Sequence, residues 1–406
     1  MTAADVRAAT LSREARLLLL AARRDARVDE AMCALLAGGG MDWRLVVELA
    51  HRERAVPVLW RRLASLPCAA LAAAGVAGLE RTALSYEFKM LYLRQRLEQT
   101  VAALAEASIP VVLLKGAALA FTVYPSLTDR PMADLDLLVP REHADQAREV
   151  ALGVGWGWRH DSQLDDFYAT HHHLAPLTDP RGMGVALELH TALFFEGHPF
   201  RFTPEMVWRD ATPVDVGGVR ALVPSVSHQL LHVCLHLAWS HGFEEGVWRG
   251  VRDVDAVAAT GRVDWDEFAR LAVESRAATA CYWTLRLTRV LLDTELPPAV
   301  LRALRPRLPA AAARAIERHY LTSMFAREDV CPSVRVRELV WRAAIQPGRS
   351  GHGGVLPWSR GDDFTPTPKP DAPPPDERAE RDSSGGALRH VRNLGVWGRY
   401  VRTLLG

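Results

Sequence analysis

Two aspartates separated by one residue are the part of the sequence best suited to chemistry. Asp134 and Asp136 lie in residues 132–139, where polar and apolar residues alternate. Such alternation predicts a strand, and a strand places residues i and i+2 on one face. Both carboxylates can therefore converge on one or two hard divalent cations, while Leu135 points to the opposite face. We expect Mg²⁺ or Mn²⁺ as the bound ion.

A third carboxylate is available on a second predicted strand. Residues 172–178 and 185–190 are expected to form a hairpin, joined by an Asp-Pro-Arg-Gly turn, and Glu188 lies in the second strand. Three carboxylates could clamp two ions, one that activates an attacking hydroxyl and one that stabilises the leaving group. His190 is expected to share the face of Glu188 only if a bulge intervenes, which disfavours direct metal ligation by His190.

Basic residues and a glycine flank the aspartates. The apolar run at 111–114 predicts a first strand and residues 117–124 a short helix, with Lys115 and Gly116 at the turn between them. Gly116 would let the backbone approach a phosphate at the helix N-terminus, where N–H groups are free. Lys115 or Arg130 could neutralise phosphate charge. Their structural alternatives are a strand-end lysine and an arginine paired with Asp134 or Asp136.

Two stretches of the chain resemble a known family. The segments LLKGAALAFTVYPSLTDRPMADLDLLVP and HHHLAPLTDPRGMGVALELH are similar to the uncharacterised nucleotidyltransferase family of the DNA-polymerase-β-type superfamily. The similarity covers about residues 40–290. It implies a nucleotidyltransferase fold, with Asp134 and Asp136 as paired metal ligands and Glu188 as the third carboxylate. Many relatives in the superfamily have Gly-Ser or Gly-Gly where this chain has Gly116-Ala117, so a hydroxyl contact to phosphate is absent here.

The remaining sequence predicts an α+β protein, in which a small mixed-sheet core lies between helical regions. We expect an N-terminal helical region at 1–108, the nucleotidyltransferase α/β core at 109–223, a C-terminal helical region at 224–346, a flexible linker at 347–386 and a basic amphipathic tail helix at 387–406. The linker assignment follows from its Pro, Gly and Ser content and its scarcity of apolar residues.

Two groups of histidines stand out in the sequence, and the first of them has the spacing of a zinc site. His228, His232 and His236 recur at every fourth residue of a predicted helix, where they would supply its polar face rather than bind zinc. The run of three histidines at 171–173 lies one hairpin away from Glu188 and is expected to be partly exposed; the alternative is that one imidazole approaches the site.

Bulk composition excludes several classes of protein. The 406 residues include 49 basic and 48 acidic side chains, so no overall field favours a nucleic acid or an anionic membrane. No uncharged apolar stretch approaches the roughly 18 residues that span a bilayer. The five cysteines are scattered and lack a C-x-x-C pair, which indicates reduced thiols and a cytoplasmic location.

These features together predict a metal-dependent, ATP-binding transferase. It would move a nucleoside monophosphate, with AMP as one candidate, from a nucleoside triphosphate to an acceptor hydroxyl or similar group. The acceptor would be a small molecule or a protein, while an RNA end is disfavoured by the net charge of +1 and stays open. The alternative is a catalytically silent nucleotide-binding or regulatory protein that retains the fold.

Overall fold

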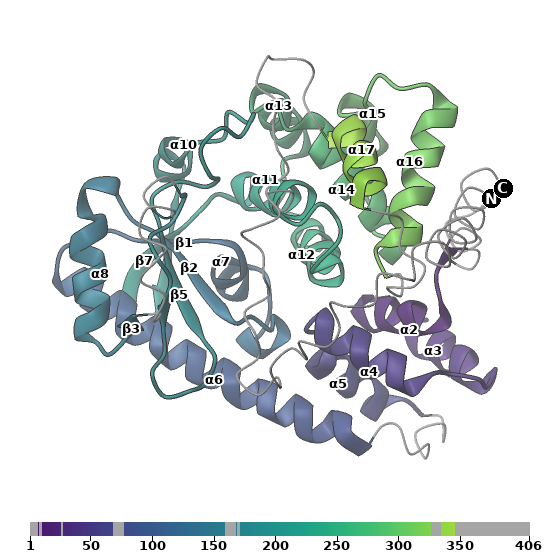
Figure 1. Ribbon diagram of the computed structural model, residues 1–406, viewed down its shortest axis with the longest axis horizontal. Helices are drawn as coiled ribbons and strands as arrows, with labels where there is room; N and C mark the ends of the chain where they lie inside the picture. The colour runs from purple at the N-terminus through teal and green to yellow at the C-terminus, as the bar shows by residue number, and fades with distance from the viewer. Residues whose placement is uncertain are drawn as a thin grey trace, which may run out of the picture.

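A computed structural model describes residues 10–25, 27–67, 77–158, 171–325 and 334–345, together with Arg7 and Tyr168. Figure 1 shows a mixed sheet with helices on both sides and helical regions at both ends of the described chain. The predicted α+β class with helical flanks is therefore confirmed. The expected linker at 347–386 and tail helix at 387–406 lie outside the described residues. None of the described helices combines the length and apolarity needed to cross a bilayer.

Seven strands form one mixed sheet in the order β3-β4-β5-β2-β1-β7-β6. Their bounds are Val112–Leu113 (β1), Asp134–Leu138 (β2), Gly157–Trp158 (β3), Leu177–Thr178 (β4), Ala186–His190 (β5), Thr212–Val216 (β6) and Val219–Val223 (β7). β2 lies at the centre, antiparallel to β1 and parallel to β5. Two strands that are far apart in sequence therefore run side by side in the same direction.

One face of the sheet is covered by α6 (Ala77–Glu106) and α8 (Ala144–Gly153), which follows a 3-10 turn at Arg141–His143. The buried residues of α6 form a stripe and share one hydrophobic cluster with Leu135 and Leu137 of β2. Since neighbouring residues of a strand alternate between faces, Asp134, Asp136 and Leu138 belong to the opposite face.

The opposite face is turned toward α7 (Lys115–Thr122), α11 (Val226–Leu235) and α12 (Val247–Ala259), as Figure 1 shows. α11 continues into a π-helical turn at His236–Ser240. The other C-terminal helices are α13 (Trp265–Glu274), α14 (Ala278–Leu292), α15 (Pro298–Ala303), α16 (Ala310–Ser323) and α17 (Val334–Ile345), and α10 (Pro204–Arg209) precedes β6. The strand face that carries the aspartates is thus covered by helices rather than open along its whole length.

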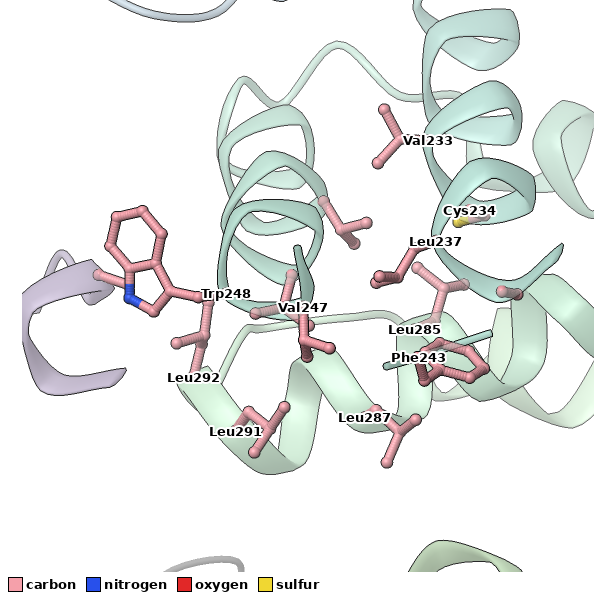
Figure 2. Packing of buried hydrophobic residues seen from close by; sticks show 14 of the residues in the cluster. Val233, Cys234, Leu237, Phe243, Val247, Trp248, Leu285, Leu287, Leu291 and Leu292 are labelled. Atoms are coloured by element: carbon pink, nitrogen blue, oxygen red, sulfur yellow. The ribbon is translucent and has the colours of Figure 1, made fainter. Parts of the chain in front are cut away.

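The C-terminal helices share one hydrophobic cluster with the N-terminal helices α2 (Arg13–Ala22), α3 (Val28–Ala37), α4 (Trp43–Arg52) and α5 (Val56–Ser65). Figure 2 shows part of it, where Leu237 comes from the π-helical turn, Val247 from α12 and Leu291 from α14. Trp248 of α12 is fully buried and donates its indole N–H to the carbonyl of Leu18 at 2.7 Å. This packing fixes α12 against the N-terminal helices and, through them, beside the sheet.

Most predicted elements of the core are observed, with shorter strands. Strand 172–178 is reduced to Leu177–Thr178 and an isolated bridge between His173 and His190. The β6–β7 hairpin was not predicted, although its Gly217-Gly218 turn, with φ of 63° and 84°, is a recognisable two-residue hairpin signal. The expectation of five reduced thiols is wrong for Cys33, which is disulfide-bonded, while Cys234 and Cys281 are free.

Candidate active site

Two carboxylates meet because β2 and β5 are parallel neighbours. Their register pairs Asp136 with Glu188 and Asp134 with Ala186. Ligand atoms of Asp136, Glu188 and His190 all lie within 4.8 Å of one another. Asp134, with a side chain 45% exposed at the start of β2, lies outside this compact group; its Oδ1 is 3.9 Å from Nη1 of Arg54. Of the three predicted carboxylates, the structure therefore places Asp136 and Glu188 in one compact group and leaves Asp134 outside it.

His190 lies close to both carboxylates, of which Asp136 is buried and Glu188 is half-buried. Its Nε2 is 3.0 Å from Oδ1 of Asp136 and 3.5 Å from Oε2 of Glu188. The pairing of β2 with β5 continues without interruption from Asp134 to Leu138, so no bulge intervenes. The prediction that His190 needs a bulge to share the face of Glu188 is wrong, because residues i and i+2 of any regular strand share a face.

Lys115 provides the second cation of the cluster. Its Nζ lies 2.8 Å from Oδ1 of Asp136. The residue has φ of 46°, a left-handed conformation that costs a non-glycine residue on the order of 1–3 kcal/mol and is typical of functional sites. The sequence had placed the need for backbone freedom at Gly116, but the positive φ lies one residue earlier.

The four groups of the cluster favour one another's charged forms. Burial opposes ionisation of Asp136, yet Lys115 and His190 hold the pKa of its carboxyl well below the usual value. Burial raises the pKa of Glu188, but the hydrogen bond with His190 lowers it, and the net pKa of Glu188 is lowered. Burial would lower the pKa of Lys115 and of His190, but the neighbouring carboxylates outweigh it and both pKa values are raised. The two carboxylates and the two basic side chains therefore stabilise one another's charges.

Gly116 lies in the first turn of α7, close to Arg130. A Cβ at Gly116 would lie 3.4 Å from Nη1 of Arg130 and 3.4 Å from Sδ of Met132, which is ordinary contact distance. Protein packing alone therefore does not require glycine at this position. A requirement for glycine would have to come from a ligand that approaches the backbone.

Arg130 is held by α12 and not by the aspartates of β2. Its Nε and Nη2 lie 2.7 Å and 2.8 Å from the two carboxylate oxygens of Asp253, and its Nη1 donates to the carbonyl of Pro131 at 3.0 Å. The hydroxyl of Tyr124 donates to the same Asp253 at 2.7 Å. The alternative that Arg130 pairs with Asp134 or Asp136 is therefore wrong. Asp253 therefore joins Arg130 and Tyr124 in one polar cluster.

The three histidines at 171–173 lie beside the carboxylates. His173 is buried, contrary to the expected partial exposure, and its Nε2 is 3.8 Å from Oε2 of Glu188. His171 and His172 are half-buried. The antiparallel bridge between His173 and His190 places this run against β5, as the predicted hairpin of residues 172–178 and 185–190 implies.

The predicted polar histidine face of α11 is wrong. His228 and His232 are buried, and their rings pack against Phe202 at centroid distances of 5.4 Å and 6.1 Å. Burial lowers the pKa of both side chains. Together with His236, they do not form a three-ligand metal group within the part of the chain that the structure describes. The disfavoured zinc interpretation of this helix gains no support.

Comparison with known proteins identifies the family. The sequence profile described as "Uncharacterised nucleotidyltransferase" matches residues 39–293, which is more than half of the chain. The chain therefore belongs to this nucleotidyltransferase family, and the resemblance noted from the sequence is confirmed. Membership supports a general role in nucleotidyl transfer and a place among transferases. Searches of curated proteins and of solved structures give no match.

Proposed function

We propose that the chain transfers a nucleoside monophosphate from a nucleoside triphosphate, such as ATP, to an acceptor hydroxyl, with release of pyrophosphate. The observation that carries the proposal is the pairing of Asp136 with Glu188 on adjacent parallel strands, in a family of nucleotidyltransferases. Asp134 lies two residues before Asp136 on the same strand face. All three side chains offer the hard oxygen ligands that Mg²⁺ and Mn²⁺ prefer.

Asp134, Asp136 and Glu188 would hold the divalent ions. When bound, the ions would act as Lewis acids on the acceptor oxygen and on the triphosphate. Lys115 and His190 keep Asp136 ionised, so the carboxylate is ready to bind a cation without first losing a proton. Lys115, at the N-terminal end of α7, is also placed to bind phosphate oxygens once an ion takes its position beside Asp136.

Surplus positive charge beside Asp134 favours a polyphosphate substrate. Arg54 lies 3.9 Å from Asp134. Burial, together with Arg54 and Arg130, lowers the pKa of Arg249 to about 10. Burial and Arg54 likewise lower the pKa of Lys89, which donates to the carbonyl of Gly184 at 2.7 Å. Basic side chains that repel one another in this way are stabilised by an anionic ligand, and a triphosphate carries several negative charges.

The second candidate is a nucleotide-binding protein without catalysis. Two observations favour it: Ala117 follows Gly116, which removes a hydroxyl ligand for phosphate, and Lys115 and His190 already neutralise Asp136 and Glu188. In such a protein the cluster would be a permanent structural ion network, and divalent ions would have little affinity for it.

Calorimetry and product analysis together separate the two candidates. The full chain is titrated with each nucleoside triphosphate in the presence of Mg²⁺, and α-labelled triphosphate is then incubated with small-molecule, protein and RNA acceptors. Transfer of label with release of pyrophosphate, lost in Asp136→Asn, supports the proposal. Nucleotide binding without pyrophosphate release supports the silent protein, and the labelled acceptor class identifies the substrate.

The matched control for Asp136→Asn is Asp145→Asn. Asp145 has a side chain that is 84% exposed in the first turn of α8, on the sheet face opposite the carboxylates. This substitution removes the same charge from the molecule without touching the cluster. Equal loss of transfer in both variants would show that the effect is not specific to the site.

A further inference from the structure

Three successive histidines gather on one side of the chain. In an extended strand, neighbouring side chains point to opposite faces. At His171 and His172 the chain instead bends before His173 pairs with His190. The ring centroids are 4.1 Å apart for His171 and His172, 4.3 Å for His171 and His173, and 4.7 Å for His172 and His173. One ligand nitrogen from each ring lies within 4.8 Å of the other two.

The orientation of His173 is fixed in a way that suits metal binding. Its Nδ1 lies 2.7 Å from the carbonyl oxygen of Leu174, so the Nδ1–H donates to that oxygen and Nε2 keeps its lone pair. A backbone carbonyl that orients an imidazole through its second nitrogen is a common outer-shell contact in metal sites. Nε2 then lies 3.8 Å from Oε2 of Glu188.

The histidine run contains a buried ring nitrogen without a hydrogen-bond partner among the described residues. Nδ1 of His172 is buried and forms no hydrogen bond with the described residues. The ring of His190 lies 5.2 Å from the rings of both His172 and His173. Unpaired buried nitrogens are rare in folded proteins and usually indicate a bound ion or water.

We propose that His171, His172 and His173 bind one Zn²⁺ ion, with Glu188 as the fourth ligand. Imidazole nitrogen is a preferred ligand of Zn²⁺, whereas Mg²⁺ prefers oxygen, so the two kinds of ion select different sides of Glu188. Zn–N bonds of about 2.0–2.1 Å require the three nitrogens to close in slightly from their present separations. The ion would fasten residues 171–173 to β5 beside the carboxylates, whether or not the chain transfers nucleotides.

The test uses the full chain after metal removal by a chelator. Co²⁺ is titrated in the presence of excess Mg²⁺, and its visible absorption bands report tetrahedral coordination; Zn²⁺ is then added to displace it. We expect one Co²⁺ per chain, displaced by one Zn²⁺. His171→Gln and His172→Gln should each weaken binding by at least about tenfold, since loss of even an outer-shell contact has that effect. His51→Gln, which changes an exposed histidine of α4, is the control.

Asp136→Asn separates this site from the proposed Mg²⁺ site. It should abolish nucleotidyl transfer and leave the Co²⁺ spectrum unchanged, so failure of one proposal does not imply failure of the other. Absence of Co²⁺ binding in the wild-type chain would overturn the zinc site, as would binding that depends on Asp136 and not on His171 or His172. If the histidine variants do not fold, X-ray absorption of the zinc-loaded wild type decides: three imidazoles support the site and an all-oxygen shell overturns it.

Discussion

The ion pair between Arg130 and Asp253 gives the sharpest test of how α12 is attached to the β2 segment. Arg130 is largely buried and Asp253 is buried, with side-chain exposed fractions of 12% and 4%, and they meet through two parallel hydrogen bonds. Asp253→Ala removes the only carboxylate that Arg130 contacts among the described residues and also deprives the Tyr124 hydroxyl of its acceptor. Breaking a buried pair on one side costs about 3–5 kcal/mol, because the remaining charge stays in a poorly solvated position.

A double-mutant cycle measures this energy. Urea unfolding followed by circular dichroism would be recorded for wild type, Asp253→Ala, Arg130→Met and the double variant. We expect each single variant to lose about 3–5 kcal/mol and the double variant to lose clearly less than their sum, because it leaves no unpaired charge. The exposed pair Arg270–Glu274, at 63% and 56% exposure, is the control, and Glu274→Ala should cost only about 0.3–0.5 kcal/mol.

Two results would refute this reasoning. A loss below about 1 kcal/mol in Asp253→Ala would mean that the pair behaves like a surface salt bridge. Additive losses in the double variant would mean that Arg130 and Asp253 act independently. ATP titration of the double variant adds a separate result, because unchanged affinity would remove Arg130 from the predicted nucleotide-binding residues.

Three further predictions concern the site and its surroundings. Gly116→Ala should leave the free energy of unfolding unchanged or raise it by up to about 1 kcal/mol, because a Cβ meets only ordinary contacts in α7. Calorimetry should show about tenfold weaker ATP binding by this variant. Unchanged affinity would mean that no phosphate approaches the backbone at Gly116. Lys115→Met leaves Asp136 with less compensation, so Mg²⁺ should raise the melting temperature of the variant more than that of wild type; an equal rise would contradict a metal site there. Burial lowers the pKa of His232 and of His241 to about 3, below the unfolded value near 6.5. The unfolded state therefore binds more protons, and stability should fall as the pH drops below about 6.5. The expected fall is up to about 1.4 kcal/mol per pH unit for each histidine. Urea midpoints at pH 7.5 and 5.5 test this, and His232→Gln should show a smaller fall than wild type.

Local sequence patterns predicted the elements that carry the carboxylates. The alternation around Asp134 and Asp136 gave the central strand, and the apolar run before Lys115 gave the strand that leads into α7. These signals are local, since side-chain periodicity within a few residues decides which face is buried. The strand that contains Glu188 was predicted for the same reason.

The contacts that complete the site depend on register and on distant segments. Arg130 and Asp253 are 123 residues apart, and no local pattern selects that partner over the nearby aspartates. The left-handed φ of Lys115 is equally absent from the sequence signal, because Gly116 next to it is the residue that ordinarily adopts such angles.

Pyrophosphate release by matched carboxylate variants tests the central claim most directly. Release from a nucleoside triphosphate, in the presence of the acceptor class that becomes labelled, would be measured with and without Mg²⁺ for wild type, Asp136→Asn, Glu188→Gln and the exposed control Asp145→Asn. Circular dichroism would first show that each variant is folded. The account predicts Mg²⁺-dependent release by wild type and by the control, with a loss of about 100-fold or more in the two site variants, since carboxylate-held metal ions supply several kcal/mol of transition-state stabilisation. Equal, metal-independent rates in all four proteins would contradict it.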